Sequence, residues 1–134
     1  MKYLIIGAGG TGGCIGGYLA SIGKDVTFIA RGVHLKAIKK NGLIIHSSRK
    51  GEMRLKNVKA FQGDEEFGKF DVIFVCVKGY SLYDATPIIK KAAYAETIVI
   101  PILNALNAQD KLSKGLTDIK IGRASCRERV FAGC

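Results

Sequence analysis

Short runs of apolar residues recur along the chain and alternate with longer stretches in which apolar positions follow helical spacing. The apolar runs predict buried strands at residues 2–6, 26–30, 71–77 and 97–103. The run at 71–77 is continuous and rich in β-branched and aromatic residues, as in strands covered on both faces of a parallel sheet. Helical spacing predicts helices at residues 11–22, 33–41, 82–95 and 106–114. This alternation indicates an α/β fold with a doubly wound parallel sheet and right-handed crossovers.

Two local features refine this picture. Residues 42–46 and 53–61 flank a Ser-Ser-Arg-Lys-Gly turn and predict a β-hairpin inserted between helix and sheet, although apolar and polar residues alternate only partly in its second strand. Pro87 falls inside the pattern at 82–95, so we predict that it sits in the first turn of that helix or kinks it.

The length of the chain, 134 residues, allows one domain with its own core, and 48% of its residues are hydrophobic. It leaves no room for a cofactor-binding domain and a separate catalytic domain. The N-terminus lacks the run of about 7–15 apolar residues that a signal peptide needs. No apolar run approaches the about 20 residues of a membrane-spanning helix. We therefore expect a soluble, cytoplasmic protein with no membrane partner.

The formal net charge of +10 raises the question of a nucleic-acid partner. The basic residues gather in two stretches, "HLKAIKK" at 34–40 and "SRKGEMRLKNVK" at 48–59. Neither stretch carries interleaved aromatic residues or a nucleic-acid-binding motif. We interpret the charge as a solvated face, or as mild attraction for a phosphate-rich ligand, and expect no nucleic acid to bind.

The cysteine pattern does not indicate a metal site. Cys14, Cys76, Cys126 and Cys134 form no Cys-x-x-Cys pair and have no histidine at ligand spacing. Cys14 falls on a predicted helix and Cys76 in a predicted buried strand, where cysteine behaves as a small hydrophobe. We expect buried, reduced thiols.

The last residues, 121–134, depart from the patterning before them. The stretch "IGRASCRERV" at 121–130 reverse-translates into one frame of a widely used short-read sequencing adapter. We therefore expect the single α/β domain to occupy residues 1–120, and residues 121–134 to be a non-native tail. The alternative is a genuine basic C-terminal helix.

A glycine-rich turn directly follows the first predicted strand. Gly7, Gly9 and Gly12 form G-x-G-x-x-G at the mouth of a predicted helix, the arrangement of a dinucleotide-binding, Rossmann-like fold. The first glycine allows the tight turn, the second lets the pyrophosphate approach the backbone, and the third packs the helix on the strand. The predicted phosphate loop is Gly7, Ala8, Gly9, Gly10, Thr11 and Gly12.

Two further glycines lie in the helix that follows. Gly16 stands four residues after Gly12, on the same helix face, where a missing side chain permits close approach to the sheet or the cofactor. We assign Gly17 to plain helix packing.

Arg31 stands at the end of the second predicted strand, where an Asp or Glu would bind the ribose 2′-hydroxyl of NAD. No acidic residue occurs from Val26 to Lys40. A guanidinium group offers a bidentate fork to a phosphate, so this position predicts NADP, bound as NADPH. The alternative is an ordinary surface arginine. His34 follows three residues later, and we expect a helix-start or surface histidine there, with no functional role.

Four segments together resemble the N-terminal domain of the ketopantoate reductase (2-dehydropantoate 2-reductase) family. They read "IIGAGGTGG", "DVTFIARGVHLKAIKKNGL", "DVIFVCVKGY" and "IVIPILNALN", and they span nearly all of residues 1–118 in the family's order. The resemblance implies reduction of a small 2-oxo acid by NADPH, converting ketopantoate to pantoate on the route to pantothenate and coenzyme A.

The same resemblance implies roles for individual residues. Residues 7–12 match the family's phosphate loop, Arg31 its 2′-phosphate contact and Lys78 a lysine at the cofactor site, while Asn104 matches an asparagine that touches nicotinamide and substrate. The chain departs from the family at Ala105, where glycine is usual, and at Asn107, where glycine is frequent. The family's second, mostly helical domain carries a substrate-positioning lysine and a proton-donating glutamate, and no such domain follows here. We therefore expect the isolated chain to be inactive.

Other functions are compatible with parts of this pattern. Another 2-oxo-acid or hydroxyacid reductase would have the same cofactor domain. A non-enzymatic NAD(P)-sensing module, such as those that gate potassium transport, would begin with a similar glycine motif but would usually carry an acid at the Arg31 position and would lack the segments containing Lys78 and Asn104. The sequence does not indicate the oligomeric state.

Overall fold

The computed structural model describes residues 1–8, 10–47, 51–56, 58–63, 67–77, 82–102 and 120–121. The three helices of this part are α1 (Gly10–Ser21), α2 (Gly32–Asn41) and α3 (Leu82–Ala92). Its strands are β1 (Lys2–Ile6), β2 (Asp25–Ile29), β3 (Leu43–Ser47), β4 (Gly51–Leu55), β5 (Lys59–Phe61), β6 (Val72–Val75), β7 (Ile98–Pro101) and β8 (Lys120–Ile121). No helix in these ranges is long and apolar enough to cross a bilayer.

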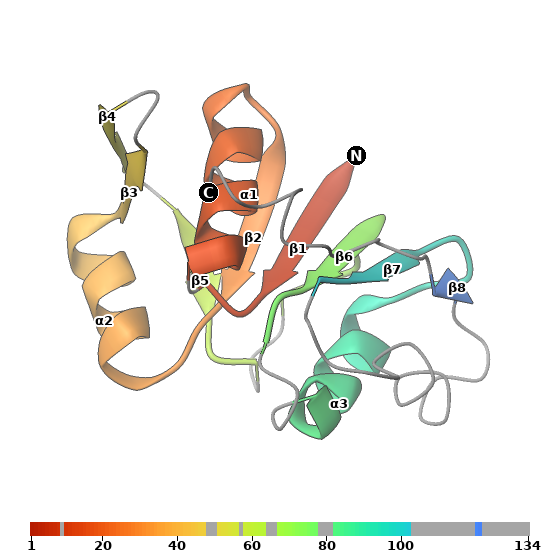
Figure 1. The fold of residues 1–134 in the computed structure, drawn as a ribbon. Helices are drawn as coiled ribbons and strands as arrows, with labels where there is room; N and C mark the ends of the chain where they lie inside the picture. Colours follow the sequence, from red (N-terminus) through yellow and green to blue (C-terminus); the bar gives the residue numbers. More distant parts are fainter. Residues whose placement is uncertain are drawn as a thin grey trace.

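The centre of the molecule is a six-stranded sheet in the order β5-β2-β1-β6-β7-β8 (Figure 1). All its strand pairs are parallel. Numbered by their place along the chain, the sheet strands run 3-2-1-4-5-6, which is the order of a doubly wound dinucleotide-binding fold. The predicted doubly wound parallel sheet is confirmed.

Two apolar clusters cover the two faces of the sheet, because neighbouring strand residues point to opposite sides. Leu4 and Ile6 of β1 belong to the cluster that includes α3, whereas Ile5 belongs to the cluster that includes α2 and the β3–β4 hairpin. Leu4 and Ile5 are both 0% exposed, so the central strand is buried on both faces. This double burial explains why the strand reads as a continuous apolar run rather than an alternating one.

The segment predicted as one strand at 53–61 is divided between two sheets, so that part of the hairpin prediction is wrong. Its first part, β4, pairs antiparallel with β3 and forms the predicted hairpin. Its second part, β5, leaves the hairpin and pairs in parallel with β2 as the edge of the main sheet. Polar Lys56 lies between the two parts.

Most other predicted boundaries agree with the structure to within a few residues. Pro87 is inside α3, in its second turn, so the first-turn alternative is wrong and the kink stays a prediction. Cys14 is buried on α1 as predicted, whereas Cys76 is half-buried just beyond the end of β6. The predicted helix at 106–114, Cys126 and Cys134 lie outside the described residues. Strand β8 spans the predicted domain boundary at residue 120, and the assignment of the tail stays a prediction.

Gly16 and Gly17 let α1 approach two different surfaces. A Cβ atom on Gly16 would lie 2.4 Å from the ring of Phe28 in β2, and one on Gly17 would lie 1.8 Å from Cδ1 of Ile45 in β3. The first glycine therefore seats the helix on the sheet, and the second seats the hairpin on the helix. Packing explains both residues.

A polar cluster ties the amino ends of three strands together at the edge opposite the glycine turn. The Asp71 carboxylate accepts hydrogen bonds from the Tyr94 hydroxyl and, at 2.7 Å, from the Lys2 backbone N–H. The backbone of Asp71 links β1 to β7, donating to Lys2 O at 2.9 Å and accepting from Ile98 N at 3.0 Å. Because the Tyr94 hydroxyl favours the ionised carboxylate, it holds the pKa of Asp71 below its ordinary value of 3.8. The same contact raises the pKa of Tyr94 above 10.0.

These shifts predict a pH window for the contribution of Tyr94 to stability. Asp71 has a lower pKa folded than unfolded, so its contribution is present above the unfolded pKa and is lost as pH falls through the folded one. Tyr94 has a raised pKa, so its contribution is lost as pH rises through it. Tyr94→Phe should therefore lower the thermal midpoint most near neutral pH and least at both extremes. Tyr18→Phe on α1 is the control, and an equally pH-dependent effect there would contradict this assignment.

Candidate functional site

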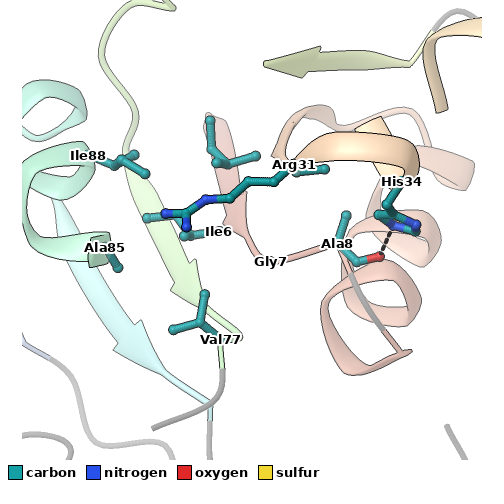
Figure 2. Close-up of a pocket in the computed structure, with 10 residues that line it drawn as sticks. Ile6, Gly7, Ala8, Arg31, His34, Val77, Ala85 and Ile88 are labelled. Carbon is teal, nitrogen blue, oxygen red and sulfur yellow. Dashed lines mark hydrogen bonds between the residues drawn. The ribbon is translucent and has the colours of Figure 1, made fainter. Parts of the chain in front are cut away.

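A cavity of about 180 Å³ opens beyond the carboxyl ends of β1 and β2, where the glycine turn begins. Gly7 and Ala8 follow β1, Arg31 follows β2, and Val77 follows β6; all four line the cavity (Figure 2). Between β1 and β6 the direction in which successive strands are added to the sheet reverses, because β2 and β5 lie on one side of β1 and β6 to β8 on the other. Open parallel sheets bind their ligands at such a switch point.

The glycine turn is as tight as the sequence predicts. Gly7 has a φ of +96°, a conformation that side chains rarely adopt, and its N–H donates to Ile29 O at 3.1 Å. A Cβ on Gly7 would lie 2.7 Å from the backbone oxygen of Cys76, and one on Gly12 would lie 1.9 Å from Gly7 O. The backbone therefore fills the space that side chains would need, and α1 begins within three residues of the turn.

Helix α1 starts at Gly10 and presents its first turn beside this loop. Unpaired backbone N–H groups and the helix dipole make such an N-terminus a site for anions, phosphates above all. The first turn of α1 contains no acidic residue that would oppose an anion. A pyrophosphate is the ligand group that this arrangement suits.

Arg31 is the residue immediately before α2, with extended backbone at φ −133° and ψ 155°. Its side chain is 61% exposed and reaches across the cavity towards α3 (Figure 2). There its Nη1 atom lies 3.8 Å from Oδ2 of Asp84, in the first turn of α3. The structure thus places a guanidinium group at the cavity mouth, as an arginine reading a phosphate requires.

His34 is exposed in the first turn of α2, as the sequence predicts, but its contact with the glycine turn is not foreseen by the sequence. Its Nε2 atom lies 2.8 Å from the backbone oxygen of Ala8, and the residue lines the cavity (Figure 2). With Nε2 protonated, the imidazole donates to that oxygen and ties α2 to the glycine turn. The sequence feature that points to this contact is the position of His34 three residues after Arg31, a spacing that brings both residues to one side of the first turn of α2.

Apolar side chains form the remaining wall of the cavity. Ile6 and Ile29 come from the strand ends, and Ala85 and Ile88 come from α3. In cavities of this kind, the apolar walls bury the apolar faces of a flat organic group, and the few polar groups at the rim fix its orientation through hydrogen bonds. A nucleotide base in the apolar part, with phosphates at the glycine turn and Arg31, matches this distribution.

Several predicted site residues lie outside this description. Gly9, Lys78 and Asn104 are not among the described residues, and nothing is described of the Thr11 side chain in α1. Within the described ranges, no group of three or more His, Cys, Asp or Glu side chains is arranged to hold a metal ion.

The strand order, the glycine turn and a cavity at the switch point together define a dinucleotide-binding α/β domain of the Rossmann type. More narrowly, the chain belongs to the ketopantoate reductase family, because residues 3–134 match the family described as Ketopantoate reductase PanE/ApbA. This is a family of pyridine-nucleotide oxidoreductases, as the fold and glycine motif predict. The suspected family resemblance is confirmed.

The chain aligns with about a third of the length of its curated relatives. The chain is 40% identical over 112 residues to an uncharacterized oxidoreductase, YkpB, of Bacillus subtilis, covering 84% of this chain and 36% of the relative. It is 36% identical over 112 residues to a 2-dehydropantoate 2-reductase of Pyrococcus horikoshii, with 84% and 36% coverage. The chain therefore spans about a third of the length of these relatives.

Solved structures give the same result. The PanE/ApbA family ketopantoate reductase of Ralstonia eutropha superposes with a TM-score of 0.82 at 29% identity, covering 92% of this chain and 40% of that one. A D-mandelate dehydrogenase solved with NADH and anilino(oxo)acetate superposes with a TM-score of 0.79 at 28% identity, again with 92% and 40% coverage. The fold of this chain thus also occurs in a D-mandelate dehydrogenase that was solved with NADH.

Proposed function

We propose that this chain is the NADPH-binding domain of an enzyme that reduces ketopantoate, a small 2-oxo acid, to pantoate in cytoplasmic pantothenate and coenzyme A biosynthesis. The observation that carries the choice of NADPH is Arg31, whose guanidinium group lies at the mouth of the cavity beyond β2. The 2-dehydropantoate 2-reductase among the relatives supports the choice of substrate.

The described residues fit the cofactor. Gly7 and Gly12 let the turn pack closely against the backbone of Cys76 and against the start of α1. A pyrophosphate would then meet the backbone N–H groups of the turn and of the N-terminus of α1. Arg31 would bind the 2′-phosphate, and the apolar wall that includes Ile6 and Ile88 would contact the adenine. His34 would keep the turn in place through its bond to Ala8. When bound, NADPH supplies the hydride for the reduction.

The substrate half of the reaction requires groups beyond this site. We assign Lys78 to the cofactor and Asn104 to the nicotinamide and substrate, both by resemblance to the family. A proton must reach the alkoxide that forms as the 2-oxo group is reduced, and an acid–base residue has to be placed for that transfer. The chain spans about a third of the length of its curated relatives, and we propose that these 134 residues alone give negligible turnover.

A second candidate is a 2-oxo-acid reductase that uses NADH. The D-mandelate dehydrogenase solved with NADH shares the fold at 28% identity, so the family architecture accepts that cofactor too. In this chain Asp84 supplies a carboxylate at the cavity mouth, where a ribose hydroxyl could donate to it.

Direct titration of the chain with NADPH and with NADH tests the proposed function. We expect saturable binding of both by calorimetry, with NADPH at least tenfold tighter, since a charge-assisted pair contributes about 1.5–3 kcal/mol and about 1.4 kcal/mol is tenfold. Equal affinities would exclude the NADPH assignment. Absence of any nucleotide binding by the folded chain would exclude the proposed function altogether.

A further inference from the structure

An acidic residue, Asp84, lies beside Arg31 and next to the lining residue Ala85, and the acid and the arginine come from opposite sides of the switch point. Arg31 follows β2, whereas Asp84 lies in the first turn of α3, which follows β6. Their nearest charged atoms, Nη1 and Oδ2, are 3.8 Å apart, and their side chains are 61% and 63% exposed. Figure 2 shows the Arg31 side chain lying across the cavity towards the wall formed by Ala85 and Ile88.

We propose that Asp84 is a specificity-determining residue that limits the preference of this site for a 2′-phosphorylated dinucleotide over its unphosphorylated form. The inference rests on the proposed nucleotide site. Without a ligand, the carboxylate of Asp84 holds the guanidinium group across the cavity mouth. A 2′-phosphate that pairs with Arg31 competes with that carboxylate for the guanidinium group or lies beside it.

Charge and hydrogen bonding make the two ligands respond to Asp84 in opposite directions. A 2′-phosphate close to Arg31 also lies close to a second anion, and like charges at such distances repel. A ribose 2′-hydroxyl is neutral and can donate a hydrogen bond to the carboxylate. In many dinucleotide folds an acid at the end of the second strand accepts this bond. Here Arg31 occupies that position, and the acid is supplied by α3.

The position of Asp84 has a purely structural explanation that must be separated from this one. An acidic side chain in the first turn of a helix stabilises the helix through its dipole. Loss of that effect would lower the stability of α3 and would reduce the affinity for both nucleotides equally. The ratio of the two affinities is therefore the informative quantity, because only a direct effect on the 2′ position changes it.

The test is Asp84→Asn in the whole chain, titrated with NADPH and NADH at low ionic strength. We expect NADPH to bind about two- to fivefold tighter, the range of an exposed ion pair. NADH should bind unchanged or about twofold weaker, so the preference for NADPH rises. In 1 M salt, where charges are screened beyond about 3 Å, the gain for NADPH should largely disappear. Asp84→Glu, which keeps the charge, should retain the wild-type ratio.

Glu52→Gln is the matched control. Glu52 pairs with Arg54 at 3.9 Å, with both side chains about half exposed, on the hairpin strand β4. Removing this charge should leave the affinities for NADPH and NADH unchanged. If Glu52→Gln changed them as much as Asp84→Asn does, the effect of Asp84 would come from the net charge of the protein, and the proposal would be overturned. An unchanged NADPH-to-NADH ratio in Asp84→Asn would also overturn it while the proposed function stands. If the wild-type chain binds neither nucleotide, both fail together.

Discussion

Replacing Gly12 with alanine is expected to remove nucleotide binding and to destabilise the fold. The added Cβ would lie 1.9 Å from the backbone oxygen of Gly7 and 3.1 Å from Cβ of Cys76. A backbone oxygen cannot rotate away as a side chain can, so α1 must shift away from the turn. Overpacking of this kind costs about 3 kcal/mol or more when the backbone has to move. A displacement of about 1 Å at a binding site lowers function about 100-fold.

Gly13→Ala is the matched control for this prediction. The same methyl group one residue later meets its nearest neighbour, Ala8 O, at 3.2 Å, which a small adjustment relieves. Alanine also favours the helix over glycine by about 1 kcal/mol, so we expect stability within about 1 kcal/mol of the wild type. Chemical denaturation and NADPH titration of both variants measure the difference. If Gly12→Ala kept the stability and the NADPH affinity of Gly13→Ala, nucleotide binding would not depend on the close contact between α1 and the turn.

The sheet could be predicted from the sequence because its central strands are buried on both faces. Residues 72–77 read as a continuous apolar run, as expected of a strand that lies between β1 and β7. The glycine motif fixed which strand comes first and therefore where the switch point lies. The edge strand β5 was harder to recognise, because only Ala60 of its three residues is buried and its pattern runs on from the hairpin. Which sheet a short strand joins is decided by packing far away in the sequence.

The sequence predicts those parts of the candidate site where a position at a strand end requires one particular type of residue. Gly7 and Arg31 stand at fixed places relative to strand ends, so their positions followed from the elements. Asp84 and His34 could not be found in this way. The pairing of Asp84 with Arg31 joins residues 53 positions apart in the chain and depends on how α3 packs on the sheet. The contact of His34 with Ala8 depends on the angle at which α2 leaves β2.

Replacing Arg31 with alanine is expected to convert the chain from a binder of NADPH into one that barely distinguishes NADPH from NADH. The guanidinium group is the only basic side chain among the described residues that line the cavity, apart from the imidazole of His34. A hydrogen-bonded pair between charged groups contributes about 1.5–3 kcal/mol. NADPH affinity should therefore fall about 10- to 100-fold, at about 1.4 kcal/mol for each factor of ten.

NADH affinity should change less than about threefold in the same variant, because NADH lacks the 2′-phosphate that Arg31 is proposed to bind. Arg31→Lys should be intermediate, since an ammonium group keeps the charge but loses the bidentate fork. Arg54→Ala is the matched control, because Arg54 is 54% exposed and also pairs with a carboxylate, at 3.9 Å, but lies on the hairpin. Calorimetric titrations of the three variants give the two affinities directly. Equal losses for NADPH and NADH would show that Arg31 shapes the cavity without reading the 2′ position, and the choice of cofactor would then have to rest on residues beyond the described cavity.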